Sequence, residues 1–104
     1  MATVIVDSNS EYIWNVSDSV LSGVLEYVMH AIDSTSPLYD LLYASKLSGN
    51  LEFHRLGESS RTLFENAVKK MHSERQGQAS SPEQVDEVKK ISQLVGLIDF
   101  AKSL

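Results

Sequence analysis

The segment DSVLSGVLEYVMHAID, residues 18–33, decides the fold because its apolar residues recur at intervals of three and four. This spacing places them along one stripe of an α-helix, and such a stripe is normally buried against neighbouring elements. Ser17 or Asp18 stands where an N-cap residue is expected. We therefore predict a helix over residues 18–33. Its predicted core residues are Val20, Leu21, Val24, Leu25, Val28, Met29 and Ile32.

A second helix is predicted over residues 37–48. Ser36 supplies a capping hydroxyl, and Pro37 follows it at the first helical position, where the missing N–H of proline costs nothing. Gly49 marks the end, because glycine readily adopts the backbone conformation that terminates a helix. The expected apolar stripe of this helix consists of Leu38, Leu41, Leu42 and Leu47.

Two more helices are predicted in the second half of the chain. The third spans residues 60–75 and is expected to be capped by Ser59 or Ser60. The fourth spans residues 82–102 and opens with Ser-Pro-Glu-Gln, residues 81–84, at capping-box spacing. Their expected core residues are Leu63, Phe64, Ala67, Val68, Met71, Val85, Val88, Ile91, Leu94, Val95, Ile98 and Ala101.

The segment before the first helix favours strands. Residues 3–16, TVIVDSNSEYIWNV, contain two β-branched or aromatic runs on either side of the turn-forming cluster at residues 7–10, which predicts a hairpin. The competing interpretation is that residues 12–16 begin a helix that continues into the first one. Residues 50–57, NLEFHRLG, suit a short extended segment that could pair with the hairpin.

Together these elements predict a mainly α domain of four helices with a short N-terminal β-hairpin or extended element. The alternative is an α+β fold with a small antiparallel sheet. A chain of 104 residues can bury a sufficient core as one domain, residues 1–104. The absence of cysteine excludes a thiolate nucleophile and a disulfide scaffold. With no signal-peptide pattern and no long apolar run, the sequence predicts a cytoplasmic protein without membrane contact.

The charge of the chain is strongly uneven along the sequence. Residues 1–50 carry six acids against one base, Lys46, whereas residues 51–104 carry eight acids and eight bases. Such a field raises encounter rates with basic partners and repels nucleic acid and anionic membrane. The charge pattern therefore predicts an acidic binding surface in the first half of the domain.

The first predicted helix carries the best candidate for that surface. On a helical wheel Asp18, Glu26, His30 and Asp33 lie opposite the apolar stripe, and no lysine or arginine lies among them. Exposed helices usually interleave charges of both signs, so this arc is either a binding face or an ordinary solvated surface of an acidic protein. Asp40, on the next predicted helix, is assigned to the same acidic surface.

Aromatic residues support a protein-binding role for this half. All four tyrosines and the single tryptophan lie in residues 1–50, and these residue types often anchor interfaces. Tyr27 borders the acidic arc and is the best interface candidate, with Trp14 as a second. Tyr39 and Tyr43 lie beside the leucines of the second helix, so we expect both to be largely buried.

No pattern in the sequence indicates catalysis or a cofactor. Glu26, His30 and Asp33 have the spacing of neighbours on a helix, but they do not match the Glu-x-x-His pattern of helical di-iron sites. The glycines stand far apart, so they form no phosphate-binding loop, and there is no nucleophile elbow. Acids neutralise the lysine pairs at 69–70 and 89–90, which argues against nucleic-acid binding. We expect no enzyme activity, no metal and no cofactor.

The order of these segments resembles the small immunity proteins of bacterial toxin–immunity systems, including those of contact-dependent growth inhibition. The resemblance covers residues 18–75. It lies in an acidic first helix, SPLYDLLY at 36–43, NLEFHRL at 50–56 and ESSR at 58–61. It implies a cytoplasmic inhibitor that occludes the active site of a cognate toxin, commonly a basic nuclease. Because such proteins share no common motif, no functional residue can be carried over.

Two other classes of function remain open from the residues alone. A helical interaction module, which could be homodimeric, would use the same apolar and tyrosine-bearing surface without needing one-sided charge. A small enzyme is the third class, although no acid–base pair or nucleophile stands out. The identity of the partner separates the first two classes. The residues do not give the oligomeric state.

Overall fold

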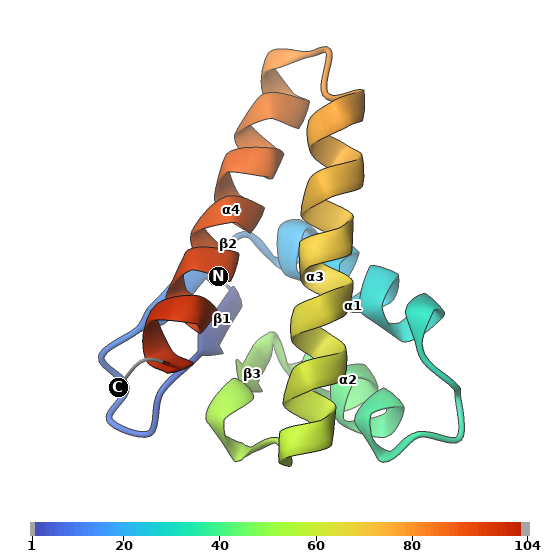
Figure 1. Ribbon diagram of the computed structural model, residues 1–104, viewed down its shortest axis with the longest axis vertical. Helices are drawn as coiled ribbons and strands as arrows, with labels where there is room; N and C mark the ends of the chain where they lie inside the picture. Colours follow the sequence, from blue (N-terminus) through green and yellow to red (C-terminus); the bar gives the residue numbers. More distant parts are fainter. Residues whose placement is uncertain (1, 103–104) are drawn as a thin grey trace.

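The two longest helices form the spine of the molecule. They are α3 (Glu58–Gln78) and α4 (Pro82–Lys102), which lie side by side in Figure 1 and pack against each other. The shorter helices α1 (Asp18–Ala31) and α2 (Pro37–Ser48) lie on the other side of α3 from α4. The computed structural model describes residues 2–102. The predicted mainly α fold with four helices and a small sheet is confirmed.

A three-stranded sheet in the order β2-β1-β3 lies beside the helices. β1 (Ala2–Ile5) and β2 (Ile13–Val16) form the predicted antiparallel hairpin, so the idea that residues 12–16 begin a helix is wrong. β3 (Asn50–Glu52) pairs with the other edge of β1 in parallel. The sheet is therefore mixed and not purely antiparallel. One turn of 3-10 helix, η1 (Phe53–Arg55), replaces the extended conformation expected after β3.

Local side-chain chemistry sets the limits of α1. The hydroxyl of Ser17 accepts a hydrogen bond from the backbone N–H of Val20, as expected for an N-cap. The helix ends at Ala31, two residues before the predicted end, because Ile32 adopts an extended backbone conformation. Asp33 then accepts the backbone N–H of Thr35 at 3.0 Å and starts a turn. Asp33 is therefore not on the helix.

The limits of α2 and α4 agree with the sequence signals, whereas α3 begins differently. Gly49 ends α2 in the left-handed region with φ of 75°. At the start of α4, Ser81 and Gln84 exchange hydrogen bonds between side chain and backbone in a capping box. The N-cap of α3 is Gly57, so the predicted serine caps are wrong, and Ser59 and Ser60 lie within its first turn.

A single cluster of buried side chains joins the sheet to all four helices. Its largest members include Phe64 of α3, whose ring lies 5.6 Å from that of Phe53 between ring centres. Trp14 of β2 is only 2% exposed, and its indole N–H donates to the backbone oxygen of Lys90 at 2.8 Å. This bond fastens the hairpin to α4. The core contains most of the predicted stripe residues, among them Leu21, Leu25, Leu38, Leu42, Val68, Met71, Ile91, Leu94 and Ile98.

Four residues predicted to be in the core are exposed: Leu41, Leu47, Leu63 and Val85. In α2 the reason is that its main packing partners are α1 and β3. Those contacts cover only one side of the helix, the side with Leu38 and Leu42. The expected four-leucine stripe of α2 is therefore split between the core and the surface.

Candidate functional site

The structure disperses the acidic arc predicted on α1. Asp18 and His30 lie near opposite ends of the helix, about 18 Å apart along its axis. Asp18 is in the first turn, where a carboxylate interacts favourably with the helix dipole. Asp33 lies in the link to α2. These side chains therefore do not form one continuous face.

Glu26 is engaged in an ion pair between helices. Its carboxylate contacts the ammonium group of Lys46 on α2. The hydrogen bond from Lys46, with the positive charge of that lysine, lowers the pKa of Glu26. The only base of the first half thus joins α1 to α2, and sequence reasoning missed this pairing because the two residues are far apart in the chain.

Tyr27 and Trp14, the predicted aromatic anchors, both make contacts within the chain. The hydroxyl of Tyr27 donates to Glu74 Oε2 of α3 at 2.7 Å, and this hydrogen bond raises the pKa of Tyr27. Half-buried Tyr27 therefore helps to hold α1 against α3. The expectation that Trp14 anchors a partner must be corrected, because its ring is in the core.

His30 and Asp33 remain at the surface and use their side chains locally. His30 Nδ1 donates to the backbone oxygen of Glu26 at 2.7 Å. The hydrogen bond from the Thr35 backbone lowers the pKa of Asp33. Asp33 is thus an exposed, ionised carboxylate that stabilises the turn leading into α2.

The most distinctive surface of the first half is on α2. Leu41, Tyr43 and Leu47 are 48%, 52% and 74% exposed, and Asp40 lies exposed among them. At 100° per residue Asp40, Tyr43 and Leu47 share one side of α2 and Leu41 lies on its flank, and exposed apolar side chains that share a helix surface are typical of interaction sites. We call these four residues the outer α2 face. It combines the carboxylate and the tyrosine that the sequence led us to expect on α1.

The outer α2 face was detectable from the sequence. At 100° per residue, Leu47 lies about 180° from Leu38, so one flank of a helix cannot bury both. The leucines of α2 thus surround the helix instead of forming one stripe. Tyr43 lies about 140° from Leu38 on the same helix and is therefore exposed, so the expectation that it is largely buried is wrong. Tyr39 is partly buried against the core.

The fold neutralises the second half of the chain internally. Most of its bases form ion pairs with acids of the same half: Arg55–Glu52, Lys69–Glu65, Lys69–Asp99, Arg75–Glu87, Lys90–Asp86 and Lys102–Glu65. In the first half only one base is present, and Glu26 takes it. The negative excess of the sequence therefore remains on the acids of the first half.

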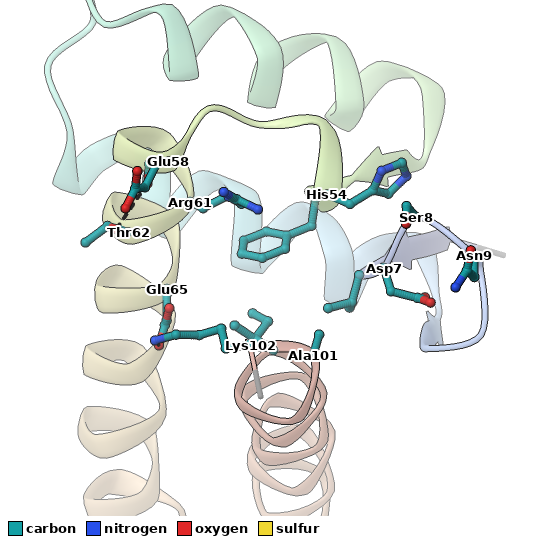
Figure 2. Close-up of a pocket in the computed structure, with 13 residues that line it drawn as sticks. Asp7, Ser8, Asn9, His54, Glu58, Arg61, Thr62, Glu65, Ala101 and Lys102 are labelled. Atoms are coloured by element: carbon teal, nitrogen blue, oxygen red, sulfur yellow. Dashed lines mark hydrogen bonds and ion pairs between the residues drawn. The ribbon is translucent and has the colours of Figure 1, made fainter. Parts of the chain in front are cut away.

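A cavity of about 600 Å³ lies between the β1–β2 loop, η1, the start of α3 and the end of α4 (Figure 2). Arg61 projects into it, while Lys102 reaches across to Glu65. Ser8 and His54 also line the cavity. The cavity contains acids and bases together and indicates no particular ligand.

Glu65 is the one buried acid of this region, and it holds α3 to α4. Its Oε1 lies 2.9 Å from the ammonium groups of both Lys69 and Lys102. Burial favours the neutral acid, but the hydrogen bonds and charges of the two lysines outweigh it and lower the pKa of Glu65. The ionised form is therefore bound more tightly in the folded protein than in the unfolded chain.

We expect Glu65→Gln to lower the free energy of unfolding at neutral pH by about 1 kcal/mol, because both lysines are partly solvated. The contribution of the ionised group is present above the ordinary glutamate pKa and is lost as the pH falls through the lower folded pKa. Urea unfolding at neutral and acid pH measures this. The difference between wild type and variant should shrink in acid, and a constant difference would contradict the role given to the charge.

Among residues 2–102, no group of three or more His, Cys, Asp or Glu could hold a metal ion. No helix within that range is long and apolar enough to cross a membrane. No protein family, curated protein or solved structure matches the chain. The surface and its charges are therefore the basis for the proposal of a function.

Proposed function

We propose that this protein is a binding inhibitor, an immunity protein that neutralises a cognate basic toxin, of nuclease type, by occluding the toxin's active site. The outer α2 face carries the proposal. Its exposed leucines and Tyr43 offer the apolar contact area of an interface, and Asp40 offers a carboxylate within that area. The partner is a protein, and the chain needs no cofactor for this role.

Charge complementarity supports a basic partner. A nuclease presents a cationic groove shaped for phosphate, and carboxylates can occupy such a groove. Asp33 is exposed just before α2, and Asp40 is exposed in the first turn of that helix. Both lie in the half of the chain that holds the negative excess. An acidic inhibitor also meets a basic toxin faster than a neutral one would, because long-range attraction increases the rate of encounter.

The alternative is a homodimeric or other assembly module without inhibitory activity, which the exposed leucines of α2 would also suit. A second copy brings the same net charge of −5, so two copies repel each other at long range. This repulsion favours a basic partner over self-association.

The test is to co-express this chain with the product of the neighbouring gene, which the proposal expects to be a basic toxin, and to measure that product's toxicity and the mass of any complex. We expect suppressed toxicity and a complex of one copy of each protein. An unchanged toxicity would contradict the proposal. A homodimer formed through the outer α2 face would favour the assembly module.

The proposed function excludes nucleic acid as a partner, and this can be measured separately. One lysine of each pair is neutralised by an ion pair, because Lys69 contacts Glu65 and Asp99 and Lys90 contacts Asp86. We expect no retention of double-stranded DNA or RNA at physiological salt in a gel-shift assay. Micromolar binding that weakens steeply with added salt would contradict this expectation.

A further inference from the structure

A second concave surface lies between β2 and α4, on the other side of the molecule from α2 in Figure 1. This groove, of about 620 Å³, is formed by residues 12–15 on one side and by Gln93, Gly96, Leu97 and Phe100 on the other. None of these residues is charged. Phe100 is 52% exposed, and its ring lies 5.1 Å from that of Tyr12 between ring centres. The groove is thus apolar and aromatic.

The floor of the groove includes an unpaired strand edge. β2 is the outer strand of the sheet, and among residues 2–102 its only strand partner is β1. The backbone N–H of Val6 donates to the backbone oxygen of Tyr12 at 2.9 Å. In an antiparallel ladder, residues alternate between those whose backbone groups bond to the partner strand and those whose groups point away from it, so this bond fixes which residues of β2 do which. Ile13 and Asn15 therefore direct their backbone N–H and C=O groups away from β1. Within residues 2–102 no hydrogen bond uses these groups.

The edge of β2 is short, at four residues, but it lacks three other common protections. Natural sheets protect free edges with charged side chains, proline or bulges, which prevent pairing with other chains. The sequence of β2, Ile-Trp-Asn-Val, contains no charged residue and no proline. Its pairing with β1 is regular and has no bulge. Ile13 is moreover 38% exposed. The edge is open to another strand.

Gly96 adds a third observation that points the same way. It lies within α4, where alanine would favour the helix more than glycine does. A Cβ at this position would meet no heavy atom within 4 Å, so packing inside the chain does not require glycine. The missing side chain instead leaves room beside the strand edge for the backbone of another molecule.

We propose that this groove binds an extended segment of another polypeptide, which adds to β2 as a fourth strand and places alternate apolar side chains against α4. The main-chain groups of Ile13 and Asn15 would hold it, as in other cases of strand addition. A bare segment fits better than a second copy. Two copies of this chain each carry a net charge of −5 and repel each other, which favours a separate uncharged or basic segment as the occupant.

The inference is independent of the proposed function, because the groove is uncharged and separate from the outer α2 face. The probe is a short capped peptide of alternating threonine and valine with a lysine at each end. We expect it to shift the amide resonances of Ile13 and Asn15 in NMR spectra and to slow their hydrogen exchange. The same peptide methylated at every backbone nitrogen should do neither.

Gly96→Leu tests the groove without threatening the fold, because leucine favours the helix and its side chain would enter open space. We expect it to weaken peptide binding about tenfold or more. Gly77→Leu is the matched control, since Gly77 is also exposed and helical with open space around it. It should leave binding unchanged.

Three results would overturn the inference. The first is an absence of protection at Ile13 and Asn15 up to the solubility limit of the peptide. The second is equal peptide affinity of the Gly96→Leu variant and wild type. The third is a wild-type dimer that Gly96→Leu dissociates, because a second copy would then be the occupant of the groove.

Discussion

Replacing Leu25 by alanine is expected to lower the free energy of unfolding by about 2–5 kcal/mol, the range for a fully buried leucine. Leu25 of α1 has no exposed surface, and the cavity left behind would lie within the cluster that joins sheet and helices. Leu94→Ala of α4 should have a similar cost, because Leu94 is equally buried. Urea unfolding followed by circular dichroism measures both.

Leu47→Ala is the matched control for Leu25→Ala. Both are helical leucines that sequence periodicity assigns to the core, but Leu47 is 74% exposed. Its removal should change stability by less than about 0.5 kcal/mol. A loss from Leu25→Ala below about 1 kcal/mol, or a large loss from Leu47→Ala, would contradict the packing described for α1 and α2.

The contrast between these leucines shows which parts of the fold follow from local sequence. Helix limits depend on short-range chemistry, so Ser36-Pro37, Gly49 and the capping box at Ser81 gave them correctly. The hairpin followed from its turn cluster and alternation in the same way. The limits of α3 were less accurate, because the cap of that helix is a glycine without side-chain hydrogen bonds.

The candidate site was harder to predict, because it depends on contacts between distant segments. The sequence indicated an acidic, tyrosine-bearing surface but not the helix that carries it. Glu26 pairs with Lys46, Tyr27 with Glu74, and Trp14 with the backbone of Lys90. Each pair joins residues far apart in the chain, so no short-range sequence pattern predicts it. The exposure of Leu47 depends on which sides of α2 receive a neighbour. The parallel pairing of β3 is equally a property of the assembled fold.

The outer α2 face should determine how long the proposed complex lasts. Once the co-expressed basic partner is in hand, we expect Tyr43→Ala to raise the dissociation rate by an amount worth about 1–3 kcal/mol. Leu47→Ala should act in the same direction while leaving the fold intact. Surface plasmon resonance measures both rates. Tyr27→Ala should affect binding less, because the Tyr27 hydroxyl is held by Glu74 within the chain.

Charge reversal at Asp40 should change the association rate of the complex, not its dissociation rate. Asp40→Lys is expected to slow association and reduce its salt dependence, because exposed charges at an interface act mainly through encounter. Glu83→Lys is a closely matched control. It makes the same change in net charge, at an exposed acid that is likewise in the first turn of its helix, so both variants lose a similar interaction with the helix dipole.

Because the two variants have the same net charge, any difference between them reports where the charge is and not how much there is. Slower association for Asp40→Lys than for Glu83→Lys, with the difference disappearing at high salt, would locate the partner on α2. Equal association rates at every salt concentration would mean that the partner responds only to the total charge of the chain. The outer α2 face would then be an exposed apolar surface without a role in binding, and the inhibitor proposal would lose the observation that carries it.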